Sequence, residues 1–144
     1  MEENKKELSR NKQQYIVMSV VYSVLNDFEN NETNVFMDPR ETIAELCNSD
    51  YDSAPLYVKK LVHLSLLHYT DAKNVFKGEL NNWKWERLPL LTRAILVFSY
   101  AHFYYYGDNV DKKIIINIAV ELAKEYVDEK QQKFVNAILD KVLK

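Results

Sequence analysis

The chain has 144 residues, of which 47% are hydrophobic and 28% are charged, and its formal net charge is −2. This length and composition predict one soluble globular domain over residues 1–144. Glycine occurs only twice and proline three times, which favours helices joined by short polar loops over a sheet-rich fold. The net charge provides no overall attraction to nucleic acid, so RNA binding would need a local basic patch.

The first half of the chain predicts four helices. The first runs over residues 6–28, because its apolar side chains recur at three- and four-residue steps: Tyr15, Met18, Val21, Tyr22 and Leu25. After a polar break, Asp38 and Pro39 are typical of the N-cap and first position of a short second helix. Residues 53–56 begin the third helix, and Thr70 or Asp71 is expected to cap the fourth, which ends near Leu80.

The second half predicts three more helices. Residues 81–87 hold two tryptophans and read as a connector packed onto the core. Pro89 begins a long, very apolar helix that Gly107 ends, and this pattern predicts a central buried helix. Asp108 or Asp111 starts the sixth helix, and Asp128 caps the seventh. The stripe expected to face inward on the sixth helix is Ile115, Ile118, Ala119, Leu122 and Tyr126.

The sequence offers little support for an enzyme, a metal site or a cofactor. His63 and His68 are five residues apart, so a helix directs them to different faces, and His102 falls in the most apolar helix as a core histidine. Two glycines cannot build a glycine-rich phosphate loop. The single cysteine, Cys47, excludes an internal disulfide and suits a small buried role in a reducing cytoplasm.

Targeting signals are also missing from the pattern. The first fourteen residues are polar throughout and predict no secretory signal. The most apolar stretch, residues 94–106, is shorter than the about 20 residues that span a bilayer. We therefore expect a cytoplasmic protein that does not enter the membrane.

Three blocks in the second half carry a family resemblance. They are WKWERLPLLTRAIL from Trp83 to Leu96, INIAVELAK from Ile116 to Lys124, and KFVNAILDK from Lys133 to Lys141. In this order and spacing they resemble the NusB family of transcription antitermination factors. The resemblance is clear from Trp83 to the C-terminus, whereas residues 29–82 match only in helical pattern and the first helix matches loosely.

The resemblance implies an all-α fold of about seven helices in two packed small bundles, and no enzymatic activity. It also implies binding of boxA-type RNA together with NusE, a ribosomal protein, within transcription elongation complexes on ribosomal RNA operons. A second hypothesis is a helical interaction module that binds NusE and has largely lost boxA recognition. A homodimer that hides the RNA surface is another state to consider, and its expected contact is the run Tyr104, Tyr105 and Tyr106.

The family's RNA surface combines a basic N-terminus with the start of the last helix. The matching residues here are Lys5, Lys6, Arg10, Lys12, Tyr22, Lys130, Lys133 and Phe134. Lysines and arginines neutralise phosphates, and aromatic rings stack on unpaired bases. The basic tract is diluted, because Asn11 and Gln14 stand at usually basic positions and nearby glutamates offset most of its charge. A solvated helix start is therefore the competing interpretation.

Two residues of the last block have structural alternatives. Phe134 could lie at the RNA face or serve as a core aromatic. Asn136 is interpreted as a structural residue whose buried amide caps backbone groups between helices. Ala137 replaces a family glycine and suggests a slightly looser helix contact there.

The resemblance also implies a NusE-facing surface near the start of the long helix. Its candidate residues are Glu86, Arg87, Thr92, Arg93 and Glu121. Thr92 replaces an acidic family residue, and Val97 and His102 replace an arginine and a glutamate. If those two formed a charge pair in the family, losing both together avoids leaving one charge unsatisfied.

Overall fold

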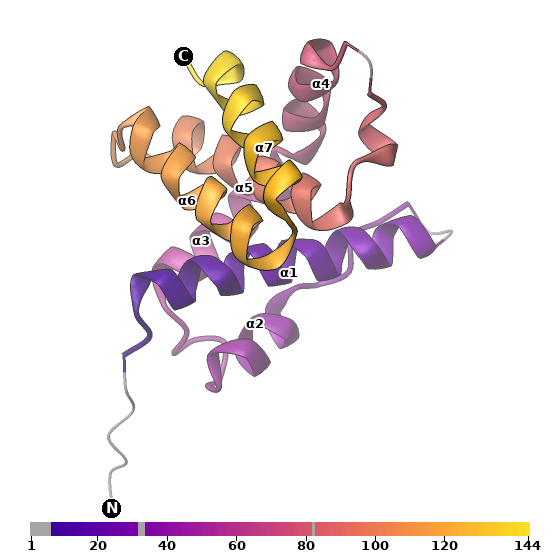
Figure 1. The fold of residues 1–144 in the computed structure, drawn as a ribbon. Coiled ribbons are helices and arrows are strands. Elements are labelled where there is room, and N and C mark those ends of the chain that lie inside the picture. Colours follow the sequence, from indigo (N-terminus) through magenta and orange to yellow (C-terminus); the bar gives the residue numbers. More distant parts are fainter. Residues whose placement is uncertain (1–6, 32–33, 82) are drawn as a thin grey trace, which may run out of the picture.

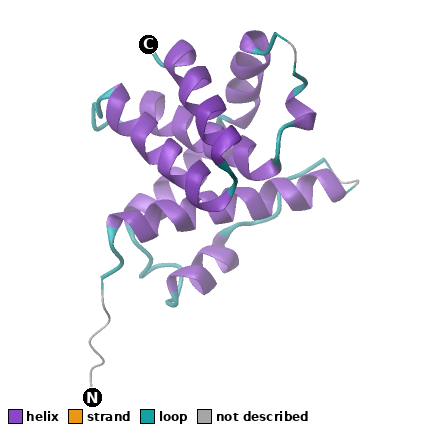
Figure 2. Ribbon diagram, in the orientation of Figure 1, coloured by secondary structure: helices purple, strands orange, loops and turns teal. Residues whose placement is uncertain are grey.

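The computed structural model describes residues 7–31, 34–81 and 83–144. Within these ranges the chain forms seven α-helices, one 3₁₀ turn and no strand (Figure 1, Figure 2). The elements are α1 (Arg10–Asn30), α2 (Arg40–Cys47), α3 (Leu56–Leu67), α4 (Tyr69–Glu79), η1 (Trp85–Arg87), α5 (Leu90–Tyr105), α6 (Lys112–Tyr126) and α7 (Glu129–Val142). The prediction of an all-α fold with seven helices is confirmed.

The helix α5 lies at the centre and joins two groups of helices. It packs against α1 and α3 on one side and against α4, α6 and α7 on the other (Figure 1). Every residue from Thr92 to His102 is buried, since neighbours cover the helix nearly all round. The first-half core is completed by four valines of α1 that have no exposed surface: Val17, Val20, Val21 and Val24.

Side-chain caps mark three of the helix starts. The Ser9 hydroxyl accepts a hydrogen bond from the Lys12 backbone N–H at 3.1 Å, so α1 begins at Arg10 and not near residue 6 as expected. Of the two aspartates proposed for α6, Asp111 is the cap, and it accepts from the Lys113 N–H at 2.9 Å. Asp128 caps α7 as predicted, with the Gln131 N–H at 2.7 Å from its carboxylate.

The starts of α2 and α4 differ from the prediction. Asp38 accepts from the Arg40 N–H at 3.0 Å as a capping residue should, but Pro39 stands just before α2 and not at its first position. The fourth helix has no side-chain cap from Thr70 or Asp71. The reason is His68, whose backbone ends α3 and begins α4, so both proposed caps fall inside the first turn of α4.

The C-terminal end of α5 is closed as predicted. Gly107 adopts φ 91°, a left-handed conformation that favours glycine, directly after the last turn. Two tyrosines of the run Tyr104–Tyr106 are partly exposed and also contact other elements of the chain. The Tyr104 hydroxyl donates to the Val142 carbonyl at 2.9 Å, and the Tyr105 ring stacks on His68 with centroids 3.5 Å apart. None of the helices in the described ranges is long and apolar enough to cross a membrane.

Candidate nucleic-acid interface

The start of α1 presents the described part of the predicted basic tract. Lys5 and Lys6 lie outside the described residues, whereas Arg10 and Lys12 are exposed on the first turn of α1. Each cation lies over an aromatic ring: the Arg10 guanidinium carbon is 3.8 Å from the Tyr57 ring centroid, and Lys12 Nζ is 4.8 Å from that of Tyr15. Both cations therefore pack against tyrosine rings, and their charged groups remain exposed to solvent.

Tyr57 of α3 fixes the position of this end of α1. Its hydroxyl accepts a hydrogen bond from Gln14 Nε2 at 3.3 Å, while Arg10 covers one ring face. The same ring meets the edge of His102, 5.6 Å away between centroids, so α1, α3 and α5 converge on it. Burial raises the pKa of the Tyr57 phenol and lowers the pKa of His102, so both remain neutral near pH 7. His102 is the core histidine that the sequence predicted.

A second aromatic contact joins α1 to the end of α6. Tyr15 and Tyr126 have ring centroids 4.9 Å apart, beside the Lys12 ammonium. The prediction that Tyr126 faces inward is wrong, because the residue is 41% exposed. It follows the buried Leu122 and Ala123 by one turn and lies beyond the core, at the corner where α6 turns into α7. The rest of the predicted stripe is buried or half-buried.

The start of α7 places a third cation beside an aromatic ring. Lys130 Nζ lies 5.4 Å from the ring centroid of Trp83, which is 49% exposed. The prediction that the connector packs both tryptophans onto the core holds for Trp85, which is 1% exposed, and fails for Trp83. Lys133 is exposed one turn further and pairs with Glu129 at 3.8 Å.

The other predicted RNA residues lie close to the surface but are less open. Tyr22 is half-buried and packs against the core, two helical turns from Tyr15 along the same side of α1. Phe134 is also half-buried against the core, which is compatible with a position at the RNA face and with a core aromatic. The interpretation of Asn136 as a buried amide is wrong. Because the buried face of α7 carries Val135, Ile138 and Leu139, Asn136 projects to solvent, and no side-chain hydrogen bond is found for it among the described residues.

The candidate partner residues are not gathered in one place. Glu86 and Arg87 are exposed on η1, where Glu86 lies 3.9 Å from Lys73 Nζ. Glu121 instead lines a groove of about 460 Å³ between α1 and α6, together with Asn11 and Tyr15. This position brings Glu121 beside the candidate nucleic-acid interface and away from η1.

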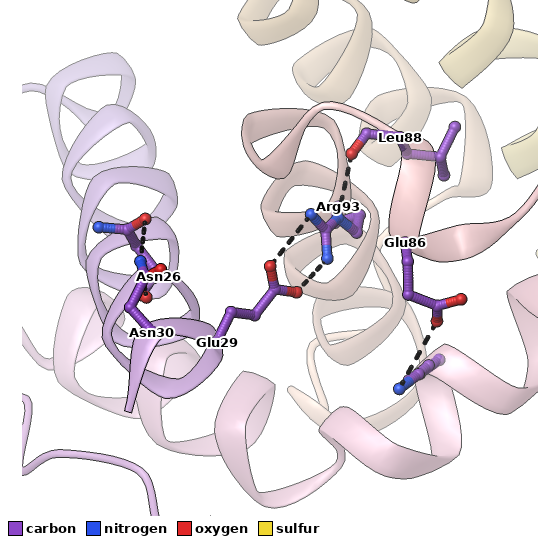
Figure 3. Close-up of polar contacts among 7 residues, drawn as sticks. Asn26, Glu29, Asn30, Glu86, Leu88 and Arg93 are labelled. Carbon is purple, nitrogen blue, oxygen red and sulfur yellow. Dashed lines mark hydrogen bonds and ion pairs between the residues drawn. The ribbon is translucent and has the colours of Figure 1, made fainter. Parts of the chain in front are cut away.

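Thr92 and Arg93 are buried, in contrast to the exposed positions expected of them. The Thr92 hydroxyl donates to Gln131 Oε1 at 2.9 Å, which ties the first turn of α5 to α7. Arg93 Nε donates to the Leu88 carbonyl at 3.1 Å, and the guanidinium forms a two-pronged ion pair with the Glu29 carboxylate (Figure 3). Both side chains satisfy their polar groups within the chain, so neither forms an open partner-binding surface.

The described residues contain no group of three or more histidines, cysteines or carboxylates able to hold a metal ion. Cys47 is buried, and burial raises the pKa of its thiol, which is the opposite of what a reactive thiolate needs. The cations and aromatic rings at the starts of α1 and α7 are groups that can bind phosphates and stack on bases.

Comparison with known proteins identifies the family. The sequence profile of the NusB family matches residues 11–144. The chain belongs to the NusB family. The transcription antitermination protein NusB of Clostridium botulinum strain Loch Maree is 29% identical over 144 residues, which covers 94% of this chain and all of the relative.

Solved structures show the shared fold. NusB of T. maritima superposes with a TM-score of 0.76 at 20% identity, covering 96% of this chain and 92% of that one. A chain from a crystal structure of the antitermination factors NusB and NusE in complex with double-stranded RNA superposes with a TM-score of 0.71 at 22% identity, covering 93% and 95%.

The sequence analysis did not single out two exposed aromatic residues that lie beside the candidate interface, Trp83 and Tyr126. A signal was present for Trp83, because it stands in a polar connector between an asparagine pair and Lys84, without the helical spacing of core residues. Tyr126 gave no such signal, since its spacing matches the buried stripe of α6.

Proposed function

We propose that this NusB-family protein is a transcription antitermination factor that binds boxA-type RNA together with NusE and acts in transcription elongation complexes on ribosomal RNA operons. It works by binding alone and catalyses no reaction. The observation that carries the proposal is the pairing of a cation with an exposed or half-exposed aromatic ring at the start of both α1 and α7, at Lys12–Tyr15 and Lys130–Trp83. Single-stranded RNA uses both partners of such a pair: phosphates bind the cations and unpaired bases stack on the rings.

Family membership supports the choice of RNA. A solved relative contains NusB and NusE with RNA, and its chain shares the fold of this one over most of its length. The overall charge of −2 gives no general attraction to RNA, so the proposal depends on the local cations at the starts of α1 and α7, Arg10, Lys12, Lys130 and Lys133. Glu121 and Glu125 line the adjacent groove and reduce this local attraction, so NusE is expected to contribute part of the affinity.

The NusE-facing surface is proposed to centre on Glu86 and Arg87, which are exposed on η1 beside Lys73. Thr92 and Arg93 would act from beneath this surface, by holding α5 against α7 and α1. Exposed charges of both signs suit electrostatic recognition of a protein partner.

The test is a titration with a boxA-type RNA and a scrambled RNA of equal length, with and without NusE, at two salt concentrations. We expect selective binding to boxA that is strengthened by NusE and weakened by salt. Replacing Lys12 or Lys130 by alanine should flatten the salt dependence by about 0.7 in slope for each phosphate that the variant no longer neutralises. Binding to NusE with no preference for boxA would instead support a protein-interaction module.

A further inference from the structure

We propose that Trp83 and Lys130 form a stacking site for one unpaired base of the bound RNA, a role that rests on the RNA-binding function proposed above. Trp83 occupies the connector between α4 and η1, and Lys130 lies in the first turn of α7. The two side chains come from segments almost fifty residues apart, yet the ammonium lies 5.4 Å from the indole centroid.

The stability of the fold does not explain why Trp83 is exposed. Trp85, two residues later, is 1% exposed and fills the core against Phe76, with ring centroids 6.0 Å apart. Trp83 leaves 49% of its surface in water, although burying an indole is among the larger hydrophobic gains available to a side chain. The connector therefore exposes the large flat apolar ring of Trp83, while the ring of Trp85 packs in the core.

Lys130 is equally unexplained by helix stability. A cation in the first turn of a helix opposes the positive end of the helix dipole, so it does not favour α7. Lys133, one turn later, is paired with Glu129, but Lys130 has no carboxylate partner in the described part of the chain. A free ammonium beside an open indole offers a contact for a phosphate next to a face for its base.

A groove beside Trp83 gives the base a place to lie. It has a volume of about 230 Å³, and Leu80, Phe134 and Ile138 line its apolar part. Pockets for drug-sized ligands start at about 300 Å³, so this groove suits one flat heterocycle and not a larger ligand. Lys141 and Glu79 also line it, while Lys84 is exposed next to Trp83.

The experiment measures boxA-type RNA binding to the NusE complex of four proteins: the natural chain, Trp83→Ala, Trp83→Phe and Tyr105→Ala. The last removes a different exposed aromatic, which stacks on His68 far from α7 in sequence. We expect Trp83→Ala to bind about 5- to 150-fold more weakly, the range for loss of one base–aromatic stack. Trp83→Phe should retain most of the affinity, and Tyr105→Ala should match the natural chain.

A second readout uses tryptophan emission. The chain has two tryptophans, and only Trp83 is open to solvent. Added RNA should quench the emission of the natural chain and protect it from acrylamide, and both effects should vanish in Trp83→Phe. The salt slope should be unchanged in Trp83→Ala and flatter in Lys130→Ala.

The outcomes separate this inference from the proposed function. If the natural chain binds boxA selectively and Trp83→Ala binds equally well, the stacking site is overturned and the function stands. If Trp83→Ala weakens NusE binding without RNA, Trp83 belongs to a protein contact and the inference is again wrong. If the natural complex shows no RNA binding, the proposed function itself fails.

Discussion

The ion pair between Glu29 and Arg93 is expected to hold the end of α1 against the start of α5, and Glu29→Gln tests it. The Arg93 side chain is 6% exposed and that of Glu29 is 39% exposed, so water reaches the carboxylate but not the guanidinium. Breaking a fully buried pair costs about 3–5 kcal/mol, and an exposed pair contributes about 0–1 kcal/mol. We expect an intermediate loss of about 2 kcal/mol in the free energy of unfolding, since Arg93 keeps its bond to the Leu88 carbonyl.

Urea unfolding followed by circular dichroism measures this loss, and thermal unfolding should show a Tm lower by about 4–8 °C. Glu45→Gln is the matched control, because Glu45 is an exposed carboxylate of α2 and should change stability by less than about 0.5 kcal/mol. The double variant Glu29→Gln/Arg93→Met should recover much of the stability, because it removes the unpaired buried charge. Equal stability of Glu29→Gln and Glu45→Gln would refute the reasoning.

Three further predictions concern stability. Thr92→Val leaves the buried Gln131 carbonyl oxygen without its donor and should cost about 1–3 kcal/mol in urea unfolding, whereas Thr92→Val/Gln131→Met should be nearer to the natural chain. Asp128→Ala removes the cap at the Gln131 N–H and should cost about 1 kcal/mol by the same assay. His102 has an ordinary pKa of 6.5 that burial lowers in the folded state, so below pH 6.5 the unfolded chain binds a proton that the folded chain does not. Stability should therefore fall as the pH drops from 7.5 to 5.5, and His102→Phe should show a smaller fall; equal falls would contradict this assignment.

The helices were predictable because their apolar positions recur at helical steps and few residues interrupt them. Helix ends were predictable where a side chain caps an isolated start, as at Asp128. The prediction failed where two helices share one residue, because at His68 the backbone itself supplies the cap and no local pattern records it. Lys6, expected within the first helix, lies outside the described residues.

The candidate site was predictable mainly at its charged residues, and less so in which side chains are exposed. The match to family positions suggests a buried Asn136 and an open Arg93, and the structure shows the reverse. The two errors have different causes. The partner of Arg93 is Glu29, 64 positions away in the chain, so no local pattern records the burial of Arg93. Asn136 lies off the apolar stripe of Val135, Ile138 and Leu139, so helical spacing alone predicts its exposure and the match to a family position misled the interpretation.

The central position of α5 determines when the apolar face of α1 is fully buried during synthesis. The helix α1 ends at Asn30, but α5, one of its main packing partners, begins only at Leu90. The valine face of α1 thus leaves the ribosome early and stays incompletely covered until α5 has been made, because α2 and α3 supply only part of its packing. By contrast, α6 and α7 are joined by only Val127 and Asp128 and can pair as soon as both are complete. The first helix to be made is among the last to complete its packing, so a chain truncated before α5 should aggregate through α1.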